Sequence, residues 1–263
     1  MLANNMNDLY IDLVSQVLTR GEKIKGTYEL RNVNFTLTNV DNCLATCRNI
    51  SLPYLIAEHS WYFSASRDTK LIGKFASLWN RITDDGFTSN SAYGFILHKK
   101  FGFDQIENAI KILNADPNSR RAVVNINTPS ADAIWTKDEP CTIALQFLIR
   151  NGKLECTAMM RSSDLWYGIP YDVAYFTTLQ KFVAHHLGLE TGLYHHFSVS
   201  LHIYDDVIEK IKLNFKNESV YFDALNAVKY AQMLQQWIYE NIESESLKTD
   251  LLTLAKTLDI IGG

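Results

Sequence analysis

The stretch Thr142–Met160 has the sequence TIALQFLIRNGKLECTAMM, and it decides the fold. Two mainly apolar runs flank Asn151-Gly152, which is the strongest short signal for a two-residue turn between antiparallel strands. We therefore expect a β-hairpin with strands at Thr142–Arg150 and Lys153–Met160. A hairpin of this length needs further strands beside it and helices to cover it.

Segments on both sides of the hairpin supply these elements. Strand patterns occur at Val33–Leu37, Ala122–Ile126 and Leu193–Tyr204. Helical spacing of apolar residues occurs at Leu9–Leu18 before Gly21, at Ile106–Leu113 after Asp104, at Tyr171–Leu187 between Pro170 and Gly188, and over most of the chain from Asp205. This irregular order predicts an α+β fold with helices packed on a mixed sheet. Because no repeat or Pro/Gly-rich linker interrupts the chain, we expect one domain over residues 1–263.

The composition limits which binding partners and which cellular compartment are expected. The chain has 263 residues, 25 Lys+Arg against 29 Asp+Glu, and a net charge of −4, so duplex DNA is not an expected partner. No apolar run approaches the roughly 20 residues of a membrane span, and the polar start of the chain predicts no signal peptide. The 4 cysteines lack the spacing of a zinc site or a disulfide framework. We expect a reducing, cytoplasmic location and no metal.

Cys141 is the first candidate for chemistry. It lies at the mouth of the first hairpin strand, after a loop that contains Trp135, Asp138 and Pro140. A cysteine there acts as a nucleophile if neighbouring cations favour its thiolate. The alternative is a small buried apolar side chain, which is the commoner fate of a free cysteine.

Two arginine motifs are candidate phosphate sites. Arg161-Ser162-Ser163-Asp164 follows the second hairpin strand, and Arg120-Arg121 precedes another strand. A guanidinium offers paired charged hydrogen bonds to a phosphate, and a serine hydroxyl adds a donor. The alternatives are a salt-bridged surface loop and two solvated arginines.

Three further pairs are weaker candidates. His202 and Tyr204 alternate on one strand face, where they either hold sugar hydroxyls or complete the edge of the core. Glu58 lies one helical turn before Trp61 and is either a proton relay or a solvated glutamate. The third pair, Trp79 and Tyr93, either lines the binding site of a planar ligand or only packs against other side chains in the protein.

Taken together, the order and spacing of these motifs resemble the thymidylate synthase superfamily over roughly Leu9 to Ile208. The resemblance rests on Glu58-His59-Ser60-Trp61-Tyr62, Leu78-Trp79, Ala92-Tyr93-Gly94, Asp116-Pro117-Asn118-Ser119-Arg120-Arg121, Pro140-Cys141, Arg161-Ser162-Ser163-Asp164, Gly168-Ile169-Pro170-Tyr171-Asp172 and Leu201-His202-Ile203-Tyr204. It implies an α+β fold that dimerises through its sheet. It also implies 5,10-methylenetetrahydrofolate as co-substrate and a pyrimidine deoxynucleoside monophosphate as substrate.

The resemblance also implies a role for each matched residue. Cys141 corresponds to the nucleophile that adds to carbon 6 of the pyrimidine, with Glu58 and Tyr93 in the water and proton network. The phosphate ligands correspond to Arg161 and Ser162, with Ser163 beside them, and to Arg120 and Arg121 from the other subunit. His202 and Tyr204 correspond to ligands of the deoxyribose 3′-hydroxyl, and Trp79, Asp164 and Gly168 to the lining of the folate and base sites.

Asp172 departs from the synthases that act on dUMP, which have asparagine at this position. An asparagine amide complements uracil, whereas a protonated aspartate complements the ring nitrogen and amino group of cytosine. This aspartate resembles the pattern of the phage-type dCMP hydroxymethylases. The alternative is an ordinary acidic residue that stabilises the start of a helix.

Other departures favour the same branch. Thr142 replaces a histidine, Met160 replaces a glutamine, and Ser89–Gly94 is close to the hydroxymethylase form of that loop. The C-terminal residues Leu258–Gly263 lack the tail with which synthases close over folate. The segment Arg20–Gly26 is shorter than the synthase phosphate loop, so Arg20, Lys23 and Lys25 all remain candidates for phosphate contact.

The sequence therefore predicts a folate-dependent hydroxymethylase that prefers dCMP. In this hypothesis Cys141 attacks carbon 6, and water placed by Glu58 completes the product. The alternatives are a dCMP or dUMP methylase that delivers hydride, a CMP hydroxymethylase, and a non-catalytic nucleotide- or RNA-binding relative. By resemblance, the setting is a virus that modifies its DNA.

Overall fold

The computed structural model describes residues 1–48, 50–128 and 134–216, and the structural statements below concern these residues. They form a mixed sheet in the order β1-β3-β8-β6-β5-β4, with β2 beside β3 and β7 beside β8. The strands are β1 (Leu2–Ala3), β2 (Glu22–Ile24), β3 (Thr27–Leu37), β4 (Val123–Asn125), β5 (Thr142–Arg150), β6 (Lys153–Met160), β7 (Ser163–Asp164) and β8 (Glu190–Tyr204). Because β3 runs antiparallel to β8 while β6 runs parallel to it, the α+β prediction is confirmed.

The hairpin that decides the fold forms as predicted. Asn151 and Gly152 have φ values of 52° and 74°, and this left-handed pair closes the tight turn between β5 and β6. The register pairs Thr142 with Met160 at the open end of the hairpin. Cys141 and Arg161 are the next residues outward, and the Arg161 N–H donates to the Cys141 carbonyl at 2.9 Å. The hairpin thereby places the two candidate residues side by side.

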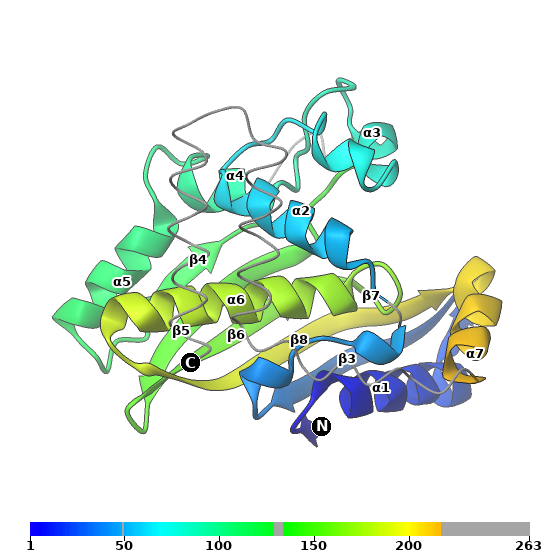
Figure 1. Cartoon of the computed structure of the whole chain (residues 1–263), viewed down its shortest axis with the longest axis horizontal. Helices are drawn as coiled ribbons and strands as arrows, with labels where there is room; N and C mark the ends of the chain where they lie inside the picture. The colour runs from blue at the N-terminus through cyan, green and yellow to red at the C-terminus, as the bar shows by residue number, and fades with distance from the viewer. Residues whose placement is uncertain (49, 129–133, 217–263) are drawn as a thin grey trace.

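Helices cover the sheet on the side that faces the viewer in Figure 1, where α6 lies across the front of the strands and α2 lies above it. The helices are α1 (Met6–Arg20), α2 (Leu52–Phe63), α3 (Leu78–Ile82), α4 (Tyr93–His98), α5 (Gln105–Ala115), α6 (Ile169–Leu187) and α7 (Ile208–Lys216). Most side chains of α6 are buried, so this helix forms the middle of the core. None of the helices in the described part of the chain is long and apolar enough to cross a bilayer.

Local sequence signals set most of the helix ends. The Asp104 side chain accepts the Glu107 N–H at the start of α5, and Gly188 ends α6 at a φ of 67°. Gly21 follows α1 in an extended conformation and donates its N–H to the Val17 carbonyl, and only glycine fits there because a Cβ would lie 2.3 Å from that oxygen. The start of α6 differs from the prediction: Pro170 lies inside the first turn instead of before it. Proline suits that turn because the N–H it lacks would have no helical acceptor there.

The helical prediction after Asp205 is met as far as Lys216, by the short 3₁₀ turn Asp205–Val207 and by α7. The rest of that segment lies outside the described residues, as does the C-terminal stretch Leu258–Gly263. The prediction that the C-terminal residues lack the tail of the synthases therefore concerns residues outside the described part of the chain.

Candidate active site

Arg161 holds the loop that carries Cys141. Its guanidinium donates from Nε to the Pro140 carbonyl at 3.0 Å and from Nη2 to the Glu139 carbonyl at 2.7 Å. These bonds leave the guanidinium exposed at the end of β6, beside the cysteine. A cation at this position can bind an anionic group next to the sulfur.

The Cys141 thiol is protonated at neutral pH. Burial raises its pKa to about 11, the charge of Arg161 lowers it, and the carboxylates of Asp172, Asp164 and Asp138 raise it. The expectation of a thiolate favoured by nearby cations is therefore only partly met, since Arg161 acts in that direction but burial dominates. The thiol has to lose its proton before it can attack.

Labelling of Cys141 by iodoacetamide is expected to accelerate about tenfold per pH unit between pH 7 and 10, because only the thiolate reacts. Peptide mass spectrometry of the intact protein after timed labelling measures this rate. Cys156, which is fully buried, is expected to stay unlabelled and serves as the internal control for folding. A labelling rate at Cys141 that is already flat at pH 7 would contradict the raised pKa.

The candidate phosphate and sugar residues meet at one end of the sheet. In the short β7–β8 pairing, Ser163 faces Leu201 and Asp164 faces His202. The Ser162 hydroxyl lies 3.4 Å from His202 Nδ1. The rings of His202 and Tyr204 meet edge to face with centroids 5.1 Å apart.

Ser163 points away from this surface. Its hydroxyl is 1% exposed and lies 3.2 Å from His196 Nε2, and His196 Nδ1 lies 2.9 Å from the Tyr194 hydroxyl. Burial lowers the pKa of His196 to about 3, so this ring is neutral. Ser163 thus anchors the motif to the core, while Ser162 is the serine that is partly exposed.

A tight turn holds Asp164 and Asp172 near each other. Asp164 Oδ1 accepts the N–H groups of Trp166 at 2.6 Å and Tyr167 at 2.9 Å, and the Asp172 N–H donates to the Gly168 carbonyl. A Cβ on Gly168 would lie 3.0 Å from the Asp164 carbonyl oxygen and 3.2 Å from Asp172 Oδ2. Glycine therefore suits this close approach, because any side chain here would crowd the Asp172 carboxyl group.

Asp172 is half protonated near neutral pH. Burial raises the pKa of its carboxyl group to about 7, and the nearby charge of Asp164 adds to this shift. Neutral Asp172 has one O–H donor and one free carbonyl oxygen.

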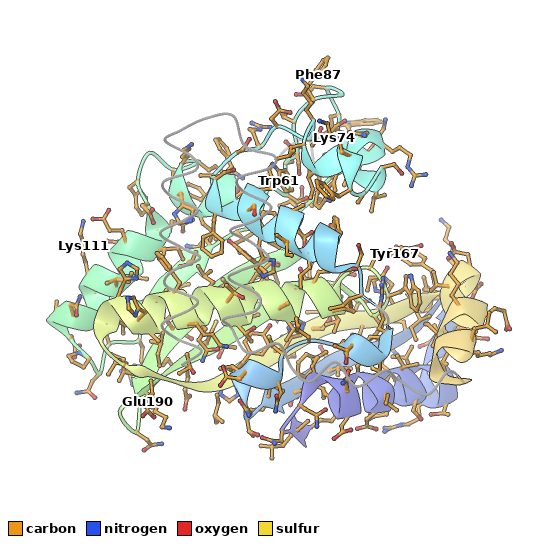
Figure 2. All side chains as sticks on the ribbon, viewed as in Figure 1. Trp61, Lys74, Phe87, Lys111, Tyr167 and Glu190 are labelled. Atoms are coloured by element: carbon orange, nitrogen blue, oxygen red, sulfur yellow. The ribbon has the colours of Figure 1, made fainter. Side chains whose placement is uncertain are left out.

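Glu58 lies in an aromatic pocket on α2. The Tyr54 hydroxyl donates to Glu58 Oε1 at 2.5 Å, and Trp79 Nε1 donates to the Tyr54 hydroxyl at 3.0 Å. Trp61, which is labelled on α2 in Figure 2, packs edge to face on Trp79 with centroids 4.9 Å apart. Burial raises the pKa of Glu58 to about 8. The hydrogen bond from Tyr54 lowers this pKa, whereas the charge of Asp172 raises it.

Tyr93 links this pocket to the cysteine strand. Its hydroxyl lies 2.9 Å from Thr142 Oγ1, and its ring stacks on Tyr62 at a centroid distance of 5.1 Å. The charge of Asp172 raises the pKa values of Cys141, Glu58 and Tyr93 alike. These four groups therefore share one electrostatic environment, although they come from four different segments of the chain.

Two carboxylates fasten the loop before Tyr93 to the loop before Cys141, and we call this arrangement the carboxylate clasp. Asp84, on the first loop, accepts from Thr136 Oγ1 at 2.6 Å and from the Lys137 N–H at 2.9 Å. Asp138, on the second loop, accepts from the Ser89 hydroxyl at 2.6 Å and the Asn90 N–H at 2.7 Å, and also from the N–H and hydroxyl of Ser91. Each loop is held by the carboxylate of the other.

Arg120 and Arg121 lie apart from this group within one chain. They precede β4, where the Phe147 N–H donates to the Ala122 carbonyl, so they flank the middle of β5 and not its Cys141 end. Both arginines are exposed.

Of the early basic residues, Lys23 is ion-paired with Asp205. The turn between β2 and β3 that contains Lys25 lies beside Tyr204, because Thr27 pairs with Tyr204. The choice among Arg20, Lys23 and Lys25 for phosphate contact stays open.

Two further residues at the site were not candidates in the sequence. Arg48 is buried, donates to the Trp166 carbonyl at 2.7 Å and lies 4.3 Å above the Trp166 ring. Tyr54 is the other, and its position four residues before Glu58 was the available signal, because this spacing puts both on one helix face. Within the described ranges there is no group of three His, Cys, Asp or Glu side chains able to hold a metal.

Comparison with known proteins finds relatives in phages and in bacteria. A deoxyuridylate hydroxymethyltransferase of Bacillus phage SP01 is 32% identical over 223 residues, 77% of this chain and 58% of the relative. One of the same name from Pseudomonas phage M6 is 31% identical over 159 residues, 59% of this chain and 45% of the relative. A thymidylate synthase of Francisella philomiragia is 26% identical over 224 residues, 78% of this chain and 80% of the relative.

The chain thus spans only about half the length of the two phage relatives, but most of the length of the bacterial one. The family model described as thymidylate synthase matches residues 8–250. With this match over most of its length, the chain belongs to the thymidylate synthase family.

Proposed function

We propose that this protein transfers a one-carbon unit to carbon 5 of dCMP and then adds water, which gives 5-hydroxymethyl-dCMP. Family membership supports one-carbon transfer to a pyrimidine nucleotide, and the names of the two phage relatives support hydroxymethylation. The observation that carries the choice of base is Asp172, a carboxyl group with a pKa of about 7 that lies close against the backbone at Gly168.

Base choice follows from hydrogen-bond polarity. Cytosine offers a ring nitrogen that accepts and an amino group that donates. Protonated Asp172 donates to the first and accepts from the second, and it also supports negative charge that develops on the ring after sulfur attack. Uracil presents the reverse pattern, so neutral Asp172 held in the orientation that serves cytosine would leave polar groups of uracil unpaired in a buried site.

The other site residues take the remaining parts of the nucleotide. Deprotonated Cys141 bonds to carbon 6. In this proposal Arg161 and Ser162 bind the phosphate, with Ser163 as their anchor to the core, and His202 and Tyr204 bind the 3′-hydroxyl. The adjacent positions of these groups at one end of β6, β7 and β8 support the assignment.

Trp79, Asp164 and Gly168 would hold the co-substrate, 5,10-methylenetetrahydrofolate, which supplies the one-carbon unit when bound. The local geometry fits a planar ligand with N–H donors. Asp164 uses Oδ1 for two backbone N–H groups, and in the described part of the chain Oδ2 has no hydrogen-bond partner and can accept another donor. Glu58 takes the proton of the water that completes the product.

A second copy of the chain supplies Arg120 and Arg121 to the phosphate in this proposal. Their exposure and their distance along β5 from Cys141 support a role in another subunit. Val123, Ile143 and Val199 are exposed on β4, β5 and β8, and a sheet-to-sheet dimer would bury such side chains.

Hydroxymethylation of dUMP is the second candidate, and the names of the phage relatives favour it. Incubation of the protein with dCMP, dUMP or CMP, each with methylenetetrahydrofolate, separates the possibilities by the mass of the product. We expect 5-hydroxymethyl-dCMP as the main product. A product from dUMP alone would overturn the base assignment, whereas a product lighter by one oxygen, formed together with dihydrofolate, would indicate hydride delivery.

A further inference from the structure

Tyr54 stands between Trp79 and Glu58 in a continuous hydrogen-bonded chain. Tyr54 and Glu58 are four residues apart on α2, and their polar ends meet at 2.5 Å. Trp79 approaches from α3 and donates to the same tyrosine oxygen at 3.0 Å. The ring of Tyr171 packs edge-on against Tyr54 with centroids 4.9 Å apart, so the tyrosine is fixed on a second side.

The direction of this chain follows from the chemistry of the groups. An indole nitrogen only donates, so the Tyr54 oxygen is the acceptor of the Trp79 bond. The single proton of the Tyr54 hydroxyl is then left for Glu58, and Oε1 of Glu58 has to accept it. Any proton that Glu58 gains or loses therefore sits on its other oxygen, Oε2.

We propose that Tyr54 is a positioning residue, held by Trp79, that commits Oε1 of Glu58 and leaves Oε2 as the oxygen that exchanges protons with water. This inference rests on the proposed hydroxymethylation. In the step concerned, the oxygen of water bonds to the exocyclic methylene carbon and its proton passes to Oε2. The electron pair of the methylene double bond moves into the ring, and the bond between carbon 6 and Cys141 breaks to release the thiolate.

The surroundings of Glu58 make this single bond important. Burial raises the pKa of Glu58, the hydrogen bond from Tyr54 lowers it, the charge of Asp172 raises it, and Tyr62 lowers it less than Tyr54 does, so that it lies at about 8. The other titratable groups that interact with Glu58 are Tyr93 on α4 and Tyr175 on α6. Loss of the Tyr54 hydroxyl removes the larger of the two contributions that favour the ionised form, so the pKa of Glu58 rises further.

Tyr54→Phe keeps the ring and deletes the hydroxyl. We expect its kcat for hydroxymethyl-dCMP formation to fall about 10- to 100-fold with KM for dCMP changed less than about threefold. The acidic limb of the kcat–pH profile, where activity rises as Glu58 ionises, is expected to move up by about one to two pH units. A merely structural role would lower activity without moving this limb.

Tyr175→Phe is the matched control, because the Tyr175 hydroxyl is buried and has no hydrogen-bond partner among the described residues. It removes the same atom from the same aromatic pocket, and its pH profile is expected to match that of the unmodified protein. Trp79→Phe, which removes the indole N–H that donates to Tyr54 together with part of the ring, is expected to move the limb in the same direction as Tyr54→Phe but less. When Tyr54→Phe and Trp79→Phe are combined, the acidic limb of the kcat–pH profile is expected to lie at the same pH as in Tyr54→Phe alone.

The outcomes separate the two proposals. If the unmodified protein makes no hydroxymethyl product, the proposed function fails before Tyr54 is tested. If the unmodified protein makes the product but the acidic limb of the kcat–pH profile does not move in Tyr54→Phe, the role of Tyr54 is overturned. The same holds if this limb moves equally in Tyr175→Phe. Thermal unfolding of each variant excludes misfolding as the cause of a lost rate.

Discussion

Asp172→Asn is expected to reverse the base preference, with kcat/KM falling for dCMP and rising for dUMP. An amide does not lose a proton at these pH values, and in the proposed site it would accept from the ring N–H of uracil and donate to the adjacent carbonyl oxygen, the reverse of the bonds proposed between protonated Asp172 and cytosine. Each mismatched hydrogen bond in a buried site costs about 1–3 kcal/mol. The dCMP/dUMP selectivity ratio is therefore expected to change by roughly 10²- to 10⁴-fold.

The pH dependence gives this prediction a second test. Because the pKa of Asp172 is about 7, the protonated form is lost as the pH rises through that value. Selectivity of the unmodified protein for dCMP is expected to decline from pH 6 to pH 8, whereas the selectivity of Asp172→Asn stays flat. Asp206→Asn makes the same chemical change on an exposed residue and is expected to alter neither. An unchanged ratio in Asp172→Asn would remove the argument for base recognition.

Cys141→Ser is expected to lower the rate of tritium release from carbon 5 of dCMP by roughly 10⁴- to 10⁶-fold, which is the loss typical of a deleted nucleophile. The serine hydroxyl has nearly the same volume, but it is far less acidic than a thiol that already resists ionisation here. The measurement is tritium release in the presence of methylenetetrahydrofolate, since this exchange follows sulfur attack and precedes addition of water.

Cys43→Ser is the control for Cys141→Ser, because Cys43 is also a partly buried free cysteine but lies on a different part of the chain. Its rate of tritium release is expected to match that of the unmodified protein. Tritium release from the Cys141→Ser variant at an unreduced rate would contradict covalent attack through Cys141.

The fold was largely predictable because its main elements carry local signals. Asn151-Gly152 fixes the central hairpin through backbone conformations that few other residue pairs adopt. Asp104 marks the start of α5 and Gly188 the end of α6 by direct bonding to the backbone or by a left-handed conformation. The order of strands in the sheet has no such signal, since the pairing of β3 with β8 joins segments that are remote in sequence.

The candidate site was predictable only where the family motif names a residue. Cys141, Glu58 and Asp172 follow from the resemblance, and the structure gives each a strongly raised pKa that no periodicity encodes. The inward turn of Ser163 onto His196 depends on strand pairing that the motif does not specify. Asp84 and Asp138 gave no signal at all, because their donors lie on a different loop.

The carboxylate clasp limits how this protein can be rebuilt. A loop taken from a relative and grafted in place of residues 84–91 would remove the donors on which Asp138 depends. A graft that replaces the loop before Cys141 would in the same way remove the donors of Asp84. Asp138 is buried, and a buried carboxylate left without donors is costly, so replacement of the loop that carries its donors is expected to destabilise the protein more than the loss of the donors to the exposed Asp84. The two loops therefore depend on each other, and recombination or design has to transfer them together.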